Sequence, residues 1–107
     1  MNDESLFRKI AESLADGVPA ALACVVETGG STPRKAGAKM VTLLDGSLFG
    51  TVGGGCVESK ARSACLDALH RWKEARLITI SLTDDAGVAD GDVCGGTMKI
   101  LVEPFFP

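Results

Sequence analysis

Apolar residues recur first at helical and then at strand spacing along this chain of 107 residues. Near the N-terminus, Leu6, Ile10 and Leu14 follow acidic residues that suit a helix start, which predicts a helix over residues 4–16. Residues 19–27 are apolar at nearly every position, as in a central strand that is covered on both faces. The chain therefore begins with an amphipathic helix and a buried strand.

Two β-prone runs follow, over residues 39–44 and 47–52, and they flank Asp45-Gly46. An Asp-Gly pair between such runs is a strong hairpin signal. In a two-residue hairpin turn, both turn residues adopt positive φ. We therefore predict a tight β-hairpin with its turn at these two residues.

The second half of the chain contains another helix and two more strands. One apolar stripe, of which Trp72 is the last member, predicts a helix over residues 56–72. Residues 76–82 and 97–103 alternate like strands, and an acidic, glycine-bearing loop over residues 83–96 separates them. This order predicts an α/β or α+β fold, a single domain in which a mixed sheet with a β-hairpin packs against two main helices.

Composition places the chain among soluble globular proteins, with 46% apolar residues, 23% charged residues and a net charge of −3. Nucleic-acid binders concentrate positive charge and stacking aromatics on one face, and this acidic chain has no tyrosine. No uncharged apolar run approaches the roughly 18 residues needed to cross a bilayer, and the N-terminus does not resemble a signal peptide. We therefore expect a cytoplasmic protein with neither a nucleic-acid nor a membrane partner.

The first candidate site is a glycine-rich segment that follows the apolar strand. It combines bare backbone at Gly30 and a hydroxyl at Ser31 with cations at Arg34 and Lys39. These groups suit a phosphate or another oxyanion, which a guanidinium binds through two parallel hydrogen bonds. The spacing differs from that of a nucleotide P-loop. The alternative is a glycine-proline loop with solvated charges.

A second cluster, Gly53-Gly54-Gly55-Cys56, leads into the second predicted helix, which carries Glu58 in its first turn. The N–H groups and partial positive charge of a helix N-terminus favour an anion and the thiolate form of a cysteine. The glycine spacing is not that of a dinucleotide-binding fingerprint. Close packing of the helix against a strand is the alternative explanation for these glycines.

A third candidate, Cys94-Gly95-Gly96, lies at the entrance to the last strand, where its glycines would leave the sulfur accessible. For this thiol and for Cys56, a functional role and a small hydrophobic role both stay open. No Cys-x-x-Cys pair and no nucleophile–base–acid set is visible, so we expect no metal site and no catalytic residues. The other two cysteines lie on apolar faces and are expected to be inert core residues: Cys24 and Cys65.

The three motifs, in this order, resemble the XdhC/CoxI family of accessory proteins of xanthine dehydrogenase and carbon monoxide dehydrogenase. The resemblance covers about residues 8–105 and is carried by residues 29–40, Asp45-Gly46, residues 50–58, Cys94-Gly95-Gly96 and Val102-Glu103-Pro104. It implies a non-catalytic maturation factor. Such a factor binds the molybdenum cofactor, shields it while its sulfido ligand is installed, and hands it to the apo-molybdoenzyme.

The resemblance also implies cargo, partners and site residues. The cargo is the molybdenum cofactor (molybdopterin), and the partners are a xanthine or carbon monoxide dehydrogenase-type subunit and a sulfurase. Family members typically continue into a C-terminal Rossmann-type domain, whereas residues 1–107 resemble the N-terminal domain alone. We therefore expect a separate Rossmann-domain partner or a homodimer. The implied cofactor-binding residues are Gly30, Ser31, Arg34, Lys39, Gly53, Gly54, Gly55, Cys56, Glu58, Cys94, Gly95 and Gly96.

Two other functions stay open on the residues alone. One is a small cytosolic thiol-dependent redox or sulfur-transfer protein that uses Cys94 or Cys56. The other is a pure protein-interaction domain, in which the glycine-rich segments only shape a surface.

Overall fold

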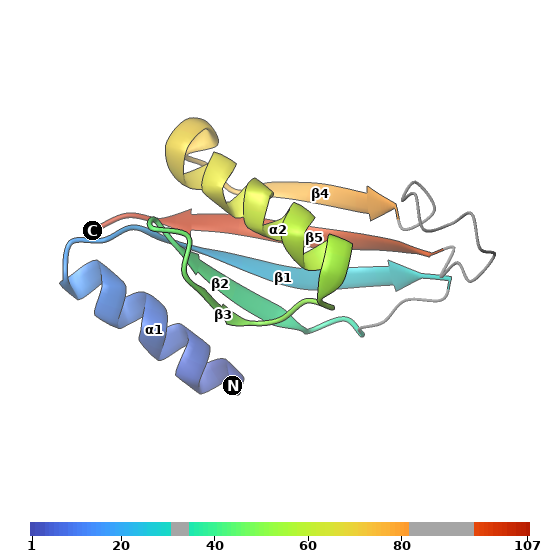
Figure 1. The fold of residues 1–107 in the computed structure, drawn as a ribbon, viewed down its shortest axis with the longest axis horizontal. Helices are drawn as coiled ribbons and strands as arrows, with labels where there is room; N and C mark the ends of the chain where they lie inside the picture. The colour runs from blue at the N-terminus through green and yellow to red at the C-terminus, as the bar shows by residue number, and fades with distance from the viewer. Residues whose placement is uncertain (31–34, 82–95) are drawn as a thin grey trace.

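The computed structural model describes residues 1–30, 35–81 and 96–107 (Figure 1). No helix in these ranges combines the length and the apolar character that crossing a bilayer requires. The elements are α1 (Asp3–Ala15), β1 (Ala20–Gly29), β2 (Lys39–Leu43), β3 (Leu48–Gly50), α2 (Gly55–Asp67), the π-helical turn η1 (Ala68–Trp72), β4 (Arg76–Ser81) and β5 (Thr97–Phe105).

The strands form one sheet in the order β3-β2-β1-β5-β4, and each pairing between described strands is antiparallel. The predicted α+β class, with two main helices on a sheet, is confirmed. The sheet itself is antiparallel in this part of the chain rather than mixed. Hydrophobic periodicity identifies a strand but carries no information about its direction, which explains the difference.

Strand alternation gives the sheet two buried faces. In β1, Ala21, Ala23 and Val25 face α2, whereas Ala20 and Leu22 face α1. Figure 1 shows α2 lying across β1 and β5. Because the faces alternate, β1 is covered on both sides, as its unbroken apolar run predicts. The helix residues in the two clusters are Val57, Ala61, Ala64, Cys65, Ala68 and Leu69 on one face, and Leu6 and Ile10 on the other.

The predicted second helix changes its hydrogen-bonding pattern before it ends. After Asp67 the chain forms the π-helical turn η1, and the Lys73 N–H donates to the Ala68 carbonyl at 2.8 Å. Lys73 has a φ of 55°, which terminates the helix. Ala68 and Leu69 stay buried against the sheet, so the apolar stripe continues through the altered turn.

The predicted hairpin is present, but its turn is of another type. The Gly46 N–H donates to the Leu43 carbonyl at 2.9 Å, and the Leu43 N–H donates to the Ser47 carbonyl at 2.9 Å. Gly46 has a φ of 91°, whereas Asp45 does not have positive φ. The connection is therefore a three-residue loop, a type I turn followed by a glycine bulge. Asp45 instead accepts a hydrogen bond from the Ser47 N–H at 2.9 Å through its side chain.

Candidate functional site

The glycine-rich segments lie towards one end of the sheet (Figure 1). Gly29 at the end of β1 and Ser81 at the end of β4 both pair with Thr97 at the start of β5. Met40 near the start of β2 pairs with Gly50 at the end of β3. The first two pairs share Thr97 and so lie together, whereas Met40 also pairs with Ala23, six residues before Gly29, so that the Met40–Gly50 pair lies further back along the sheet. We call the part of the sheet from Ala23 to Gly29, with the segments that adjoin it, the glycine end; it comprises residues 29–30, 35–39, 50–58 and 96–97.

Three consecutive glycines shape the entry into α2. Gly53, Gly54 and Gly55 have φ values of 145°, 73° and 55°, a region that residues with a side chain rarely adopt. A Cβ added at Gly54 or Gly55 would meet no described atom within 4 Å. Backbone conformation, rather than close packing of the helix on a strand, therefore accounts for glycine at these two positions.

The start of α2 lacks a side-chain cap among the described residues, because its N-cap residue is Gly54. The Gly54 carbonyl accepts the first helical hydrogen bond from the Glu58 N–H at 3.3 Å. The preceding Gly53 N–H donates to Thr51 Oγ1 at 3.1 Å. Cys56 is exposed on this first turn, while Glu58 is half-buried. A helix start of this kind offers N–H groups and partial positive charge to an anion.

Lys39, which the sequence groups with the first glycine segment, is directed away from the start of α2. In β2 the Met40 side chain packs in the cluster beneath α2, whereas Val41 packs beneath α1, on the same face as Lys39. Lys39 Nζ lies 2.7 Å from Asp3 Oδ2 and donates to the Gly37 carbonyl at 3.1 Å. The hydrogen bond to Asp3 raises the pKa of Lys39.

The other predicted site residues fall into two groups. Gly30 is exposed directly after β1 with a φ of 68°, and Gly96 is buried directly before β5. The structure thus brings these two glycines close to each other, because Gly29 pairs with Thr97, while the side chain of Lys39 points to the α1 face. Outside the described residues lie Ser31, Arg34, Cys94 and Gly95.

Asp3 is the residue at this end that sequence reasoning missed. The sequence favours it only as an acidic residue of a helix start. Its ion pair with Lys39 joins α1 to β2, which are separated in the sequence by all of β1. A pattern of neighbouring residues cannot predict such a pairing, because the pairing depends on which face of β2 the lysine occupies.

The described cysteines occupy three different environments. Cys65 is buried in the cluster beneath α2, as predicted, and burial raises the pKa of its thiol to about 11. Cys24 is half-buried rather than part of the core, and Cys56 is exposed. Within residues 1–30, 35–81 and 96–107, no group of three or more histidine, cysteine or acidic side chains is arranged to hold a metal ion.

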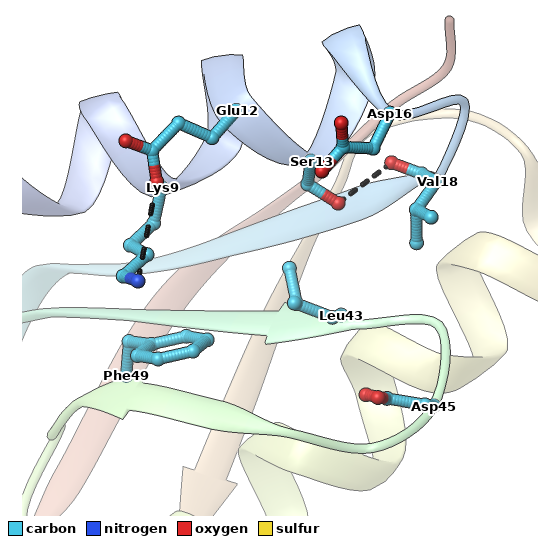
Figure 2. Close-up of a pocket in the computed structure, with 8 residues that line it drawn as sticks. All are labelled: Lys9, Glu12, Ser13, Asp16, Val18, Leu43, Asp45 and Phe49. Carbon is cyan, nitrogen blue, oxygen red and sulfur yellow. Dashed lines mark hydrogen bonds and ion pairs between the residues drawn. The ribbon is translucent and has the colours of Figure 1, made fainter.

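A cavity of about 230 Å³ lies at the opposite end, between α1 and the β2–β3 hairpin (Figure 2). Lys9 Nζ lies 4.8 Å from the centroid of the Phe49 ring and 4.0 Å from Glu12. The Ser13 hydroxyl donates to the Val18 carbonyl at 2.8 Å. Several of the polar groups that line the cavity are thus already paired with one another. Its lining residues are Lys9, Glu12, Ser13, Asp16, Val18, Leu43, Asp45 and Phe49.

Comparison with known proteins identifies relatives of this chain. The model of the XdhC and CoxI family matches residues 13–81. The uncharacterized protein YqeB of Escherichia coli K12 is 37% identical over 98 residues, which are 92% of this chain and 18% of YqeB. The molybdenum cofactor insertion chaperone PaoD of the same organism is 38% identical over 73 residues, which are 68% of this chain and 23% of PaoD.

A crystal structure described as a xanthine dehydrogenase from Bacillus halodurans has the same fold over this region. It matches 97% of this chain and 30% of its own chain, with a TM-score of 0.79 and 27% sequence identity. The chain thus spans less than a third of the length of each of these three relatives. The resemblance carried by the glycine motifs is confirmed, because the family model matches more than half of the sequence. This chain belongs to the XdhC and CoxI family.

Proposed function

We propose that this domain binds the molybdenum cofactor and assists its sulfuration and insertion into a xanthine dehydrogenase-type molybdoenzyme. The observation that carries the proposal is the glycine-shaped, uncapped start of α2 at the glycine end. The similarity to PaoD, a molybdenum cofactor insertion chaperone, supports this cargo. The structural similarity to a xanthine dehydrogenase structure supports this class of partner. The role is that of a carrier, which needs no catalytic residues of its own.

The cargo has chemistry that suits the groups at this end. Molybdopterin carries a phosphate together with anionic oxo and thiolate groups. A phosphate suits the N–H groups at the start of α2, and Arg34, which lies outside the described residues, would add a guanidinium. The exposed Cys56 thiol is a soft ligand suited to molybdenum or to the transferred sulfur.

Anaerobic equilibrium titration of the protein with purified molybdenum cofactor tests the proposal. We expect saturable binding with a Kd below about 100 μM, which corresponds to a binding free energy more favourable than about −5.4 kcal/mol. Arg34→Ala should weaken binding. Arg71→Ala is the matched control, because this exposed arginine lies on η1, away from the glycine end, and should leave the Kd unchanged. A wild-type protein that does not saturate in this range contradicts the proposal.

The exposure of Cys56 favours a second candidate, a thiol-dependent sulfur-transfer or redox role. In that case Cys56→Ser abolishes transfer of sulfur to the bound cofactor and leaves the Kd for the cofactor close to the wild-type value. A variant that keeps full sulfuration in the presence of a sulfurase contradicts this second role.

Self-association, or association with a Rossmann-domain protein, belongs to the same proposal. The strand β4 lies at one edge of the sheet, and its Leu77 side chain is 58% exposed. Exposed edges and apolar side chains of this kind support pairing with a second chain. Light scattering at tens of micromolar (a rough working range) should report a dimer, and a monomeric mass contradicts self-association.

A further inference from the structure

The first turn of α1 contacts the base of both glycine segments. Asp3 is ion-paired with Lys39, the first residue of β2. Leu6 lies against Gly50, because a Cβ added there would come within 3.1 Å of Leu6 Cδ2. Gly50 ends β3 and is followed by the segment that enters α2. One turn of helix thus touches the end of residues 35–39 and the beginning of residues 50–55.

Lys39 is held from two sides in this arrangement. Its Nζ contacts the Asp3 carboxylate and the Gly37 carbonyl, and its side chain is only 17% exposed, against 59% for Asp3. The neighbouring Ala38 packs against the cluster beneath α2, and its carbonyl accepts a hydrogen bond from the Val25 N–H at 2.9 Å. Because Ala38 and Lys39 are adjacent in the chain, holding Lys39 also restrains Ala38 against the cluster beneath α2, the helix that carries the proposed anion site.

We propose that Asp3 and Lys39 form a tether that positions residues 35–38, and that Lys39 promotes anion binding through this tether rather than by contacting the anion. This inference rests on the proposed function. It changes the role that the sequence suggests for Lys39 from ligand to positioning residue. The raised pKa of Lys39 supports the tether, because the hydrogen bond to Asp3 is the largest cause of the shift.

Reversal of the two charges separates a tether from a ligand. We expect Asp3→Lys and Lys39→Glu each to weaken binding of the molybdenum cofactor about two- to five-fold, the range of an ion pair that solvent reaches from one side. The double variant restores the pair with the charges exchanged, and its Kd should return to within about two-fold of the wild-type value. If Lys39 contacts the anion directly, the double variant stays as weak as Lys39→Glu, and the tether is wrong.

Two controls separate the tether from charge and folding effects. Glu4→Lys changes the net charge of α1 as Asp3→Lys does, but it breaks only the exposed pair with Arg8, so the Kd should stay unchanged. Asp3→Asn removes the charge without changing the shape of the side chain. It should weaken binding less than Asp3→Lys does, because asparagine keeps an acceptor for Lys39 and brings no second positive charge to it, and its urea transition should show a folded protein. An Asp3→Lys protein that binds as tightly as wild type overturns the inference.

Amide hydrogen exchange in the free protein tests the tether even if no cofactor binds. The Gly37 N–H donates to the Val25 carbonyl at 2.7 Å, next to the tether. We expect its exchange to accelerate about two- to five-fold in each single variant and to recover in the double variant. Unchanged exchange in the single variants overturns the tether. If cofactor binding fails in wild type while exchange follows this pattern, only the proposed function is contradicted.

Discussion

The Lys39 carbonyl oxygen occupies the space next to Gly50 so closely that a Cβ added at position 50 would lie 2.5 Å from it. Gly50 also has a φ of 79°. Gly50→Ala therefore combines backbone strain with overlap against a strand that is fixed by its own hydrogen bonds. We expect it to lower the free energy of unfolding by about 2–4 kcal/mol, measured by urea denaturation.

Gly17→Ala provides the matched control for this substitution. Gly17 has a φ of 80°, almost the same as Gly50, but a Cβ there would meet no described atom within 4 Å. Gly17→Ala therefore measures the cost of the backbone strain alone, a loss of about 1–2 kcal/mol in the free energy of unfolding. Equal losses in the two variants would show that the contact with Lys39 contributes nothing.

The Thr42 hydroxyl gives a second prediction. Thr42 is fully buried beneath α2, and its Oγ1 has no hydrogen bond of ordinary geometry within the described part of the chain, although the Cys65 thiol lies close to it. Thr42→Val keeps the shape and removes the unpaired hydroxyl. We expect the free energy of unfolding to rise by about 1 kcal/mol. Thr42→Ser, which keeps the hydroxyl and loses a methyl group, should lower it by about 1 kcal/mol. A less stable valine variant contradicts this account.

Thiol accessibility gives a third prediction. Burial raises the pKa of Cys65 to about 11, whereas Cys56 is exposed at the start of α2. Because the thiolate is the reactive form, iodoacetamide at pH 8 (roughly the ordinary thiol pKa) should modify Cys56 in the native protein and Cys65 only after denaturation. Peptide mass mapping of native and urea-treated samples makes the measurement. Modification of both thiols at the same native rate contradicts the burial of Cys65.

The hairpin turn gives a prediction for acidic pH. Hydrogen bonds from the Ser47 hydroxyl and from its N–H hold the pKa of Asp45 below its ordinary value of 3.8. A depressed pKa means that the folded state binds this proton less tightly than the unfolded state does. The stabilisation is therefore present above pH 3.8 and is lost as the pH falls through the lower folded value.

Asp45→Asn removes this titration and tests the assignment. We expect the stability advantage of wild type over the variant to shrink as the pH is lowered from 5 to about 3 in a series of urea titrations. An advantage that stays constant or grows in acid would assign the stabilisation to other groups.

Local periodicity predicts most of the elements of this fold. The stripe containing Leu6 and Ile10 predicts α1, and the apolar run over residues 19–27 predicts a strand covered on both faces. Both predictions succeed because these patterns involve only residues that are close in the sequence. Strand direction is not contained in them, since it depends on long-range pairs such as Gly29 with Thr97. The turn type depends on Asp45. Its side chain accepts a hydrogen bond from the Ser47 N–H, and its backbone does not adopt positive φ.

The candidate site was predictable to a similar extent. Three consecutive glycines before a helical stripe predict an unusual backbone at the start of α2, and Gly53, Gly54 and Gly55 have it. Proximity in sequence also groups Lys39 with the first glycine segment. Alternation along β2 directs its side chain to the other face, where Asp3 binds it. That partner comes from a separate helix, so the interaction emerges only with the tertiary fold.

The position of β1 between two clusters has a consequence for cooperativity. Ala21 and Leu22 are adjacent in sequence yet belong to different layers, so neither layer retains its centre when this strand is lost. We therefore expect the two layers to unfold together in a single all-or-none transition, as small domains usually do. A state in which one layer stays folded while the other is unfolded should therefore not be populated at equilibrium.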